Sequence, residues 1–344
     1  MSHILILRFS SLGDVLMTLP VIDTAARQNP DVHFTLVSRP YVRPLVELLP
    51  SNVHMVEADL SGNHRGFSGL NLLCRRLMAL HPTAVADMHD VLRSQWLRFR
   101  LNITGVEIAH IKKDRKARRE FILAKVKQQQ YPTFEKYADV LRKLGLRCDL
   151  DFHSLYPSEG ADLAAVLPDF DLASRPERHW VAIAPFAAHK GKTYPLDMME
   201  QVVAALSKRG DVRVLLFGAG VEERAVLEGW SATYEHVESL AGHLKGLHEE
   251  LAVISHCKVM VSMDSANMHL ASLAAVPVVS IWGATHPLGG FLGYGQSLDN
   301  AIHRTDLQCR PCSTYGQKPC SEGDYPCLLG ISPETIVRKT ESLL

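Results

Sequence analysis

The sequence lacks any long apolar run. Its apolar opening stretch is ended by Arg8, and no segment reaches the roughly 18 apolar residues of a membrane-spanning helix. It also lacks an excess of either charge, with 37 Lys and Arg against 37 Asp and Glu. A balanced chain has no global field that would draw it onto nucleic acid. We therefore predict a cytoplasmic protein with no signal peptide, no membrane span and no nucleic-acid partner.

Cysteine is scarce, with seven residues among 344, which is too few for a secreted disulfide scaffold. Four of them lie close together in a segment that spans residues 309–327: Cys309, Cys312, Cys320 and Cys327. The first pair has the C-x-x-C spacing of zinc ligands, whereas six residues separate the second pair. The cluster leaves three alternatives open: a structural zinc site, a redox-sensitive disulfide and reduced thiols.

Apolar residues make up 47% of the chain, enough for two packed cores, and short apolar runs alternate with segments of helical periodicity. The runs predict strands at residues 4–7, 33–37, 53–56, 84–87, 106–111, 181–185, 212–217, 258–263 and 276–281. Helices are predicted at residues 14–27, 70–80, 195–208, 222–230, 247–255 and 265–274. This alternation is typical of parallel sheets covered by helices on both faces.

The alternation pauses between residues 150 and 178, where Asp, Pro, Ser and Gly accumulate. A linker there predicts two doubly wound α/β domains, residues 1–172 and 173–344. The second would contain the cysteine-rich segment 309–327 and a terminal helix.

Polar residues in small-residue turns follow three of the predicted strands. The first turn runs from Arg8 to Asp14, and Gly13 permits a close approach of the backbone. It is not a dinucleotide fingerprint, which needs three glycines. Asp14 has two interpretations: it caps the first helix, or it takes a proton from an attacking hydroxyl.

The second turn carries Lys190 and Lys192 in a loop of small residues that leads into a helix near Pro195, which suits an anionic ligand. The third turn begins at Asp264 and Ser265 and enters another helix, whose free N–H groups could receive a phosphate. Each turn alone has a simpler interpretation, surface lysines in one and a helix cap in the other. Their coincidence at strand-to-helix transitions favours a ligand site.

Eight Lys and Arg residues lie in residues 105–130 against three acidic residues. The simpler interpretation is a solvated helix face. The alternative is a patch for a phosphorylated or membrane-embedded acceptor.

Several short motifs, in order along nearly the whole chain, resemble glycosyltransferase family 9, the heptosyltransferases of lipopolysaccharide core assembly. They are Ser10-Ser11-Leu12-Gly13-Asp14 with Leu19-Pro20, Lys192-Thr193-Tyr194-Pro195, Phe217-Gly218 with Glu222-Glu223, Asp264-Ser265 with His269-Leu270-Ala271, and Pro277 with Gly283-Ala284-Thr285 and Pro287. The resemblance implies a GT-B fold, two Rossmann-like domains facing an interdomain cleft. It further implies transfer of heptose from ADP-heptose, or a similar nucleotide sugar, onto a lipid A-core oligosaccharide with inversion, with peripheral contact at the cytoplasmic face of the inner membrane.

The resemblance also implies roles for single residues. Asp14 and Lys192 would be catalytic, as general base and as phosphate contact. The donor site would comprise Gly13, Lys192, Glu222, Asp264, Ser265, Ala266, Asn267 and His269, and the acceptor site Ser10, Arg93 and Ser94. No Asp-x-Asp pair lies near these motifs, so we expect catalysis to need no cofactor, the structural zinc aside.

The sequence departs from the family at Ala187, Ala188 and Ala266, where relatives often carry hydroxyl residues or, in the last case, glycine. Phosphate contacts would then come from backbone N–H groups and lysines, and another nucleotide sugar stays open as donor. Two further functions stay open as well. One is a nucleotide-sugar epimerase, which would need no acceptor, and the other is a non-catalytic nucleotide-sugar-binding protein on the same scaffold.

Overall fold

The structure is a computed structural model of the chain and describes residues 2–168 and 177–344. Its internal contacts divide the chain into two units. Unit 1 comprises Met1–Lys113 and Tyr131–Leu155, and unit 2 comprises Asp114–Gln130 and Tyr156–Leu344. The basic segment 114–130 therefore belongs to unit 2, although it precedes the last part of unit 1 in the sequence. The predicted boundary between residues 172 and 173 lies outside the described residues.

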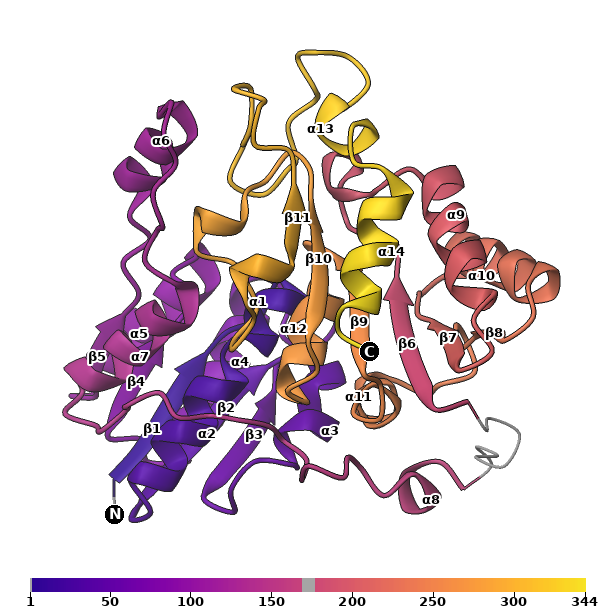
Figure 1. Cartoon of the computed structure of the whole chain (residues 1–344). Coiled ribbons are helices and arrows are strands. Elements are labelled where there is room, and N and C mark those ends of the chain that lie inside the picture. The colour runs from indigo at the N-terminus through magenta and orange to yellow at the C-terminus, as the bar shows by residue number, and fades with distance from the viewer. Residues whose placement is uncertain (1, 169–176) are drawn as a thin grey trace. The chain divides into compact units, whose positions relative to one another are not determined.

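Unit 1 is built on a sheet of five parallel strands in the order β3-β2-β1-β4-β5 (Figure 1). The strands are β1 (Ser2–Leu7), β2 (Val32–Ser38), β3 (Val53–Glu57), β4 (Ala84–Asp87) and β5 (Glu107–His110). Successive strands run outward from β1 to β3, and the chain then crosses back to β4 on the other side of β1. The loops that follow β1 and β4 leave the sheet in opposite directions. The carboxyl ends of these two strands are therefore the position at which open α/β sheets bind ligands.

Helices cover the sheet of unit 1. They are α1 (Leu12–Leu16), α2 (Leu19–Gln28), α3 (Arg43–Val46), α4 (Gly66–Met78), α5 (Leu92–Asn102) and α7 (Thr133–Lys143), with a 3-10 turn η1 (Pro40–Val42). Leu5 and Leu7 of β1 pack in one core cluster with α4 and α5 residues such as Leu73 and Leu97. Ile4 and Ile6 alternate with these leucines, point to the opposite face and are equally buried. Both faces of β1 are therefore covered, as the apolar run predicts.

One predicted helix is two. The sequence predicts a single helix over residues 14–27, but α1 ends at Leu16 and α2 begins at Leu19. Pro20 occupies the first turn of α2, where a missing N–H is tolerated. Inside one continuous helix, Pro20 could not donate to the carbonyl of Leu16, so the break falls just before it.

Unit 2 contains a sheet of six parallel strands in the order β11-β10-β9-β6-β7-β8. The strands are β6 (His179–Ala184), β7 (Val212–Leu216), β8 (Val237–Ser239), β9 (Val259–Met263), β10 (Val278–Trp282) and β11 (Ala301–His303). Numbered from β6, this is the order of a six-stranded Rossmann sheet, and its reversal lies between β6 and β9. The three-residue strands β8 and β11 were not predicted, because such short segments have too few alternating positions to give a pattern.

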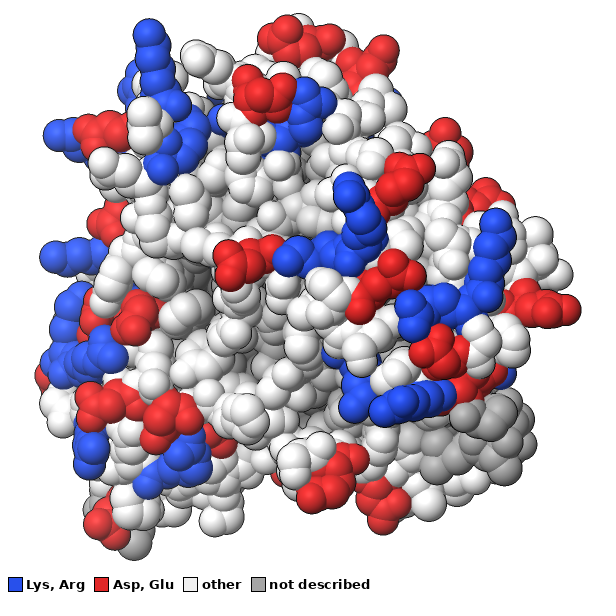
Figure 2. Space-filling view, in the orientation of Figure 1, with Lys and Arg blue, Asp and Glu red and all other residues white. Residues whose placement is uncertain are grey.

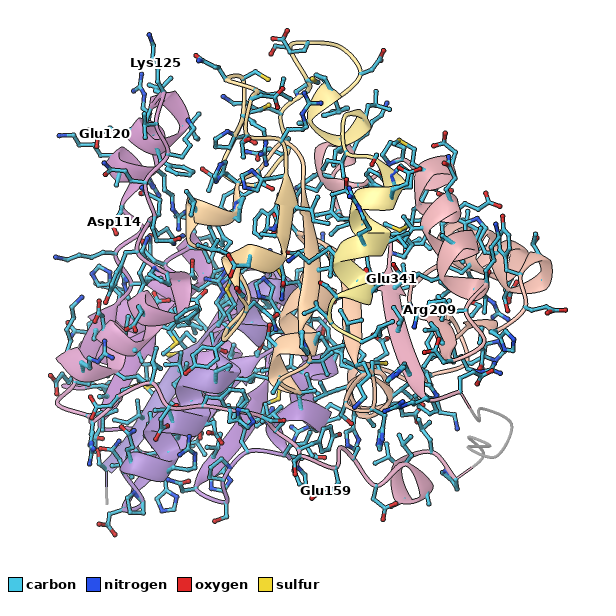
Figure 3. The ribbon with its side chains drawn as sticks, in the orientation of Figure 1. Asp114, Glu120, Lys125, Glu159, Arg209 and Glu341 are labelled. Carbon is cyan, nitrogen blue, oxygen red and sulfur yellow. The ribbon has the colours of Figure 1, made fainter. Side chains whose placement is uncertain are left out.

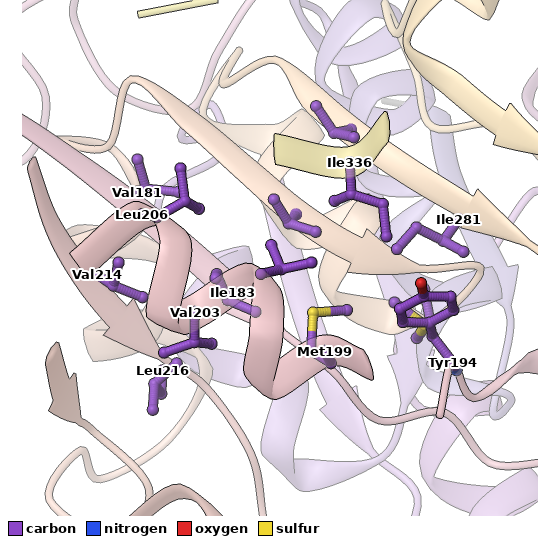
Figure 4. Close-up of a cluster of buried hydrophobic side chains, with 14 of the residues drawn as sticks. Val181, Ile183, Tyr194, Met199, Val203, Leu206, Val214, Leu216, Ile281 and Ile336 are labelled. Carbon is purple, nitrogen blue, oxygen red and sulfur yellow. The ribbon is translucent and has the colours of Figure 1, made fainter. Parts of the chain in front are cut away.

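The helices of unit 2 are α6 (Arg115–Leu123), α8 (Leu163–Val166), α9 (Leu196–Ser207), α10 (Val221–Thr233), α11 (Leu247–Ile254), α12 (Ala266–Leu273), α13 (Pro326–Leu329) and α14 (Pro333–Glu341). Short 3-10 turns are η2 (Lys190–Lys192), η3 (Pro287–Gly289) and η4 (Leu298–Asn300). Figure 4 shows the core between β6, β7 and α9, where Val181, Ile183 and Val203 interdigitate. Tyr194 is buried beside this core and donates its hydroxyl to the carbonyl of Ile331, 2.6 Å away.

The chain ends within unit 2, where α14 packs against α9. Ile336 of α14 is completely buried in the core cluster. At the rim, Arg209 beyond α9 forms an ion pair with Glu341 at 3.3 Å, and both side chains are labelled in Figure 3. The predicted terminal helix is therefore part of this core, and the prediction of two doubly wound parallel α/β units is confirmed.

Candidate functional site

At the reversal in unit 1, the turn after β1 carries a charged pair. Arg8 immediately follows β1 and is 7% exposed, and its guanidinium lies 2.5 Å from the carboxylate of Asp14. Arg8 also donates to the carbonyl of Met88 at 2.8 Å and lies 5.7 Å from the centre of the Tyr137 ring. It thereby connects the turn after β1 to the turn after β4. Arg8 lies in the first predicted turn, but no role was predicted for it, although a basic residue directly after a buried strand was a usable signal.

Asp14 has contacts that fit both predicted roles. It stands at the third position of α1, and its carboxylate accepts from the backbone N–H of Ser11 at 3.3 Å and from the Ser11 hydroxyl at 2.8 Å. This is the arrangement of a helix cap. The side chain is nevertheless 18% exposed, so the carboxylate is not sealed from solvent. Of the other predicted residues in this turn, Ser10 is exposed and Gly13 lies within α1.

The second turn at this reversal is organised by Asp87, the last residue of β4, which is completely buried. Its carboxylate accepts from the backbone N–H groups of His89 and Asp90 at 2.9 and 2.8 Å and from Arg98 at 3.2 Å. Asp90 forms a second ion pair with Arg98 at 3.2 Å. These bonds set the direction in which α5 leaves the sheet.

The two residues predicted to contact the acceptor differ in accessibility. Arg93 is exposed on the first turn of α5. Ser94 is fully buried, and its hydroxyl accepts from the N–H of Val91 and donates to the Val91 carbonyl. This geometry gives Ser94 a capping role, and its predicted acceptor contact is untested.

At the reversal in unit 2, Lys192 and Asp264 form an ion pair with 3.0 Å between Nζ and Oδ2. Lys192 ends η2 in the loop after β6, and Asp264 directly follows β9. Thr285, beyond β10, donates its hydroxyl to the same carboxylate oxygen at 2.7 Å. Three β–α loops thus converge on Asp264, which is 6% exposed, while the Lys192 side chain keeps 16% exposure.

The remaining residues of the third predicted turn begin α12. Ser265 is its N-cap, and Ala266 and Asn267 form its first turn, all three half-buried. His269 is 6% exposed within the helix. The free N–H groups of this first turn lie at the same strand end as Lys192, as the sequence predicts.

The cysteine-rich segment packs directly on the Lys192 loop. A Cβ on Gly316 would lie 2.6 Å from Cγ of Lys192, and one on Gly191 would lie 3.1 Å from the Gly316 carbonyl. Arg310, which is 2% exposed, anchors the segment to the sheet. Its guanidinium donates to four carbonyl groups and contacts His303; the carbonyls are those of Trp282, Gly283, Thr285 and Arg304. The segment therefore holds Lys192 in place.

Burial and the neighbouring thiols of Cys309 and Cys320 raise the pKa of Cys312. Cys309, Cys312 and Cys320 are half-buried and Cys327 is buried, and all four are free thiols. Within residues 2–168 and 177–344, no group of three or more His, Cys, Asp or Glu side chains is placed to hold a metal ion. Burial raises the pKa of Cys327 to about 11. The structure gives no support to the predicted zinc site, which stays a hypothesis.

A pocket of about 230 Å³ lies at the carboxyl ends of β7 and β8, and β7 pairs with β6, the strand that precedes the Lys192 loop. It is lined by Phe217, Gly218, Ala219, Gly220, Leu240, Gly242, Leu244, Gly246 and Glu250. The predicted donor residue Glu222 is exposed on the first turn of α10 and is not part of the lining, whereas its neighbour Glu223 accepts from the N–H of Ala219 at 2.8 Å.

Sequence reasoning missed this pocket. The signal was a set of four glycines that follow the neighbouring strands β7 and β8: Gly218, Gly220, Gly242 and Gly246. The last three have positive φ angles of 85°, 78° and 121°. Glycine tolerates such angles and lets a ligand approach the backbone. Glu250 presents a half-buried carboxyl to the pocket, and burial raises its pKa.

The basic segment 114–130 forms α6 and a following loop. Its basic side chains gather over α6 in Figure 2, and Lys125, Glu120 and Asp114 are labelled in Figure 3. Arg118 donates to the Tyr315 hydroxyl at 2.8 Å, and Lys127 donates to carbonyls at the end of α6, including that of Phe121 at 2.8 Å. Arg115, Lys116, Arg119 and Lys125 are exposed, as in a solvated helix face.

A much smaller pocket, of about 20 Å³, lies between α6 and the end of β10. Its lining is mainly apolar and includes Phe121, Trp282 and Phe291, with Arg118 and His286 as charged or titratable members. Burial and the Arg310 charge lower the pKa of His286 to about 3.

The pH dependence of stability tests the burial of His89. The ring centres of His89 and Phe9 are 5.6 Å apart. Burial and the nearby Arg8 charge lower its pKa to about 3. The unfolded chain takes up this proton near pH 6.5 and therefore binds more protons below that value, so acid favours unfolding. We expect His89→Gln to reduce the stability lost between pH 7 and pH 5 by about 2 kcal/mol in urea unfolding. The exposed His153→Gln should leave that loss unchanged, and equal losses in both variants would contradict the burial.

The packing of the cysteine-rich segment on Lys192 predicts a difference between two glycines. Gly316 and Gly295 have φ angles of 74° and 70°, but no atom lies within 4 Å of a Cβ on Gly295. Both alanine variants carry the same backbone strain, whereas only Gly316→Ala also collides with Lys192. We expect Gly316→Ala to lose roughly 1–3 kcal/mol more stability than Gly295→Ala, the cost of overpacking. Urea unfolding of both variants measures this, and equal losses would show that the segment does not hold Lys192.

Comparisons with known proteins agree with this geometry. The model of "Glycosyltransferase family 9 (heptosyltransferase)" matches residues 72–324. Lipopolysaccharide heptosyltransferase 1 of Pseudomonas aeruginosa is 26% identical over 385 aligned positions, which cover 99% of this chain and 98% of the relative.

Two solved structures are similar over their whole length. The glycosyl transferase family 9 protein of Veillonella parvula has a TM-score of 0.76 at 19% identity, covering 99% of this chain and 97% of its own. The E. coli ADP-heptose lps heptosyltransferase II has a TM-score of 0.71 at 16% identity, covering 100% of this chain and 98% of its own. These likenesses show the GT-B fold. Because the family model matches most of the sequence, the chain belongs to glycosyltransferase family 9 and is a glycosyltransferase.

Proposed function

We propose that this glycosyltransferase moves a heptose from ADP-heptose onto a lipopolysaccharide inner-core acceptor, with inversion at the anomeric carbon. The observation that carries the proposal is the pair of charged sites, Arg8 with Asp14 and Lys192 with Asp264, at the strand-order reversals of the two units. The names of the relatives support the substrates: the Pseudomonas protein is a lipopolysaccharide heptosyltransferase and the E. coli protein an ADP-heptose one.

The donor diphosphate would bind at the reversal in unit 2. Lys192 supplies the positive charge, and the N-terminus of α12 supplies free N–H groups and the Ser265 hydroxyl. The Asp264 carboxylate would repel a phosphate, and its bonds to Lys192 and Thr285 indicate that it orients the lysine. Because Ala187, Ala188 and Ala266 offer no hydroxyl, backbone N–H groups and Lys192 carry the phosphate contacts.

The nucleoside would occupy the pocket at the ends of β7 and β8, whose glycines allow a flat base to lie against the backbone. This pocket adjoins β6 in the same sheet, so one nucleotide can extend from it to Lys192. For Glu222 to contact the donor, as the resemblance implies, its exposed side chain would rotate toward the pocket rim. Glu250, which lines the pocket, is a second carboxyl available to the sugar hydroxyls.

The acceptor would bind at the reversal in unit 1. Asp14 would take the proton from the acceptor hydroxyl while that oxygen forms its bond to the anomeric carbon. The bond from this carbon to the diphosphate breaks on the opposite face, and the electron pair leaves with ADP. Arg8 would hold the Asp14 carboxylate in position, and Lys192 with the α12 N–H groups would stabilise the charge that develops on the leaving group.

This scheme uses no metal ion, and the zinc hypothesis for the four clustered cysteines concerns stability alone. A cytoplasmic location with peripheral contact at the inner membrane follows from the proposed acceptor, which is lipid-linked. An epimerase or a non-catalytic binding protein is disfavoured by membership of a transferase family.

Substitution of Lys192 tests the donor site. We expect Lys192→Ala to weaken ADP binding in calorimetry by roughly 1.5–3 kcal/mol, the contribution of hydrogen bonds to charged groups. Lys190, two residues earlier in η2, is exposed, with its ammonium 6.0 Å from the Tyr325 ring centre. Lys190→Ala therefore serves as the matched control and should retain the affinity. An unchanged affinity in Lys192→Ala would remove this residue from the site.

Substitution of Asp14 tests the transfer reaction itself. We expect Asp14→Asn to keep its ADP affinity but to lose roughly 10²–10⁴-fold in turnover, because an amide cannot accept the proton. The measurement is acceptor-dependent release of ADP from ADP-heptose at saturating donor and acceptor.

Two controls separate the base from the cap. Ser11→Ala removes a hydrogen bond to Asp14 but keeps the carboxylate, so its turnover should stay close to that of the wild type. Asp14→Glu keeps a base and should recover part of the lost rate. Wild-type turnover in Asp14→Asn would leave Asp14 as a cap only, and ADP release or donor isomerisation without acceptor would contradict the proposed transferase activity.

A further inference from the structure

Helix α5 of unit 1 has two apolar faces. Ser94, Leu97 and Leu101 point into the core and are completely buried. On the opposite side, four apolar residues recur at helical spacing: Leu92, Trp96, Phe99 and Ile103. At 3.6 residues per turn these four positions fall within about 60° of one another. A helix that covers only one core would carry polar residues there.

The outer face is exposed to solvent. Leu92 is 85%, Phe99 57% and Ile103 68% exposed, and Trp96 is half-buried. Phe67 at the start of α4 extends the face: it is 71% exposed, and its ring lies 5.3 Å from that of Trp96. Trp96 in turn lies 6.2 Å from Phe99 and donates its indole N–H to Asn71 at 3.2 Å. We call Phe67, Leu92, Trp96, Phe99 and Ile103 the aromatic face.

The charges on α4 and α5, the two helices that carry the aromatic face, have one sign. Residues 60–86 and 91–106, which include α4 and α5, contain no Asp or Glu. Arg93 and Arg100 directly follow Leu92 and Phe99 on α5, and Arg65 and Arg75 lie at the start and on the outside of α4. Among the described residues, none of these four arginines forms an ion pair. The face therefore combines exposed aromatic side chains with positive charge that is not neutralised.

We propose that the aromatic face of unit 1 docks on the surface of an anionic phospholipid bilayer, with α5 lying in the interface and its arginines on the headgroups. Tryptophan and phenylalanine favour the level of the headgroups, and basic residues beside them are attracted by anionic lipids. No helix in the described parts of the chain is long and apolar enough to cross a membrane, so this contact would be peripheral.

The charges disfavour a second copy of the chain as the occupant. In a two-fold symmetric contact the same surface patch meets itself, so the arginines of one copy would face those of the other. Nothing on these two helices could neutralise them, since both lack acidic residues. A bilayer with anionic headgroups supplies the missing negative charge and covers the apolar side chains in one contact.

Trp96 offers a direct readout of docking. The chain has four tryptophans, and Trp180, Trp230 and Trp282 are 8%, 5% and 0% exposed. Lipid-induced changes in tryptophan fluorescence therefore report on Trp96. We expect the full chain to sediment with vesicles of 30% phosphatidylglycerol in phosphatidylethanolamine but not with neutral phosphatidylcholine, and brominated lipids to quench Trp96.

The double variant Phe99→Ser with Ile103→Ser should lower the partition coefficient into anionic vesicles at least tenfold. Both side chains are exposed and lie outside the core, so the variant should keep its fold. Arg93→Gln with Arg100→Gln should weaken binding to the anionic vesicles and reduce its dependence on salt. Leu298→Ser, an apolar substitution at a 44% exposed site in unit 2, is the matched control. Leu123→Ser with Val126→Ser tests the rival basic segment around α6.

Each other outcome overturns the proposal. Three outcomes concern the vesicles: the wild type does not bind anionic vesicles, the Phe99 and Ile103 variant binds them as well as the wild type does, or only the Leu123 and Val126 variant loses binding. The fourth is that the wild type is a dimer and the Phe99 and Ile103 variant is a monomer. The docking proposal rests on the proposed function only because the proposed acceptor is lipid-linked. Vesicle binding is measured without any transfer reaction, so it tests docking independently of the activity. Transfer to a water-soluble acceptor without acyl chains should be equal in the wild type and in the Phe99 and Ile103 variant, and its absence in both would contradict the proposed function but not the docking.

Discussion

The reversal of strand order in each parallel sheet is the constraint on which the candidate site depends. Loops on either side of a reversal leave the sheet in opposite directions, so the strand ends between them stay open. In unit 1 this position lies between β1 and β4, and in unit 2 between β6 and β9. Arg8 and Asp14 follow β1. Lys192 follows β6 and Asp264 follows β9, the two strands on either side of the reversal in unit 2.

In the proposed reaction, each charged pair combines a structural and a chemical role. Asp14 closes the first turn of α1 and also stays open to solvent beside Arg8. Asp264 is held by Thr285 and in turn holds Lys192, whose stem is confined by Gly316. A side chain fixed in this way loses little conformational freedom when a ligand binds, which favours both affinity and catalysis. The interactions that stabilise the loops are therefore the same ones that would position the proposed reactive groups.

The sequence was sufficient for the architecture and for the three polar turns, because buried parallel strands are nearly continuous apolar runs and each turn follows one directly. It was insufficient where contacts join distant residues. The pocket of Gly218, Gly242 and Glu250 combines two loops and a helix, and Arg310 is buried by carbonyl groups from two separate segments, residues 282–285 and residue 304. Neither leaves a local periodicity. Ser94 shows the converse, since its hydroxyl is fully used by its own helix start.

The central claim is that one nucleotide binds along the carboxyl edge of the unit 2 sheet. A crystal structure of the chain with ADP tests it most directly. It should show the diphosphate within hydrogen-bond distance of Lys192 Nζ and the start of α12, and the adenosine in the pocket that contains Gly218 and Gly242. A nucleotide in the smaller pocket beside Trp282 and His286, or one that does not contact Lys192, would contradict it.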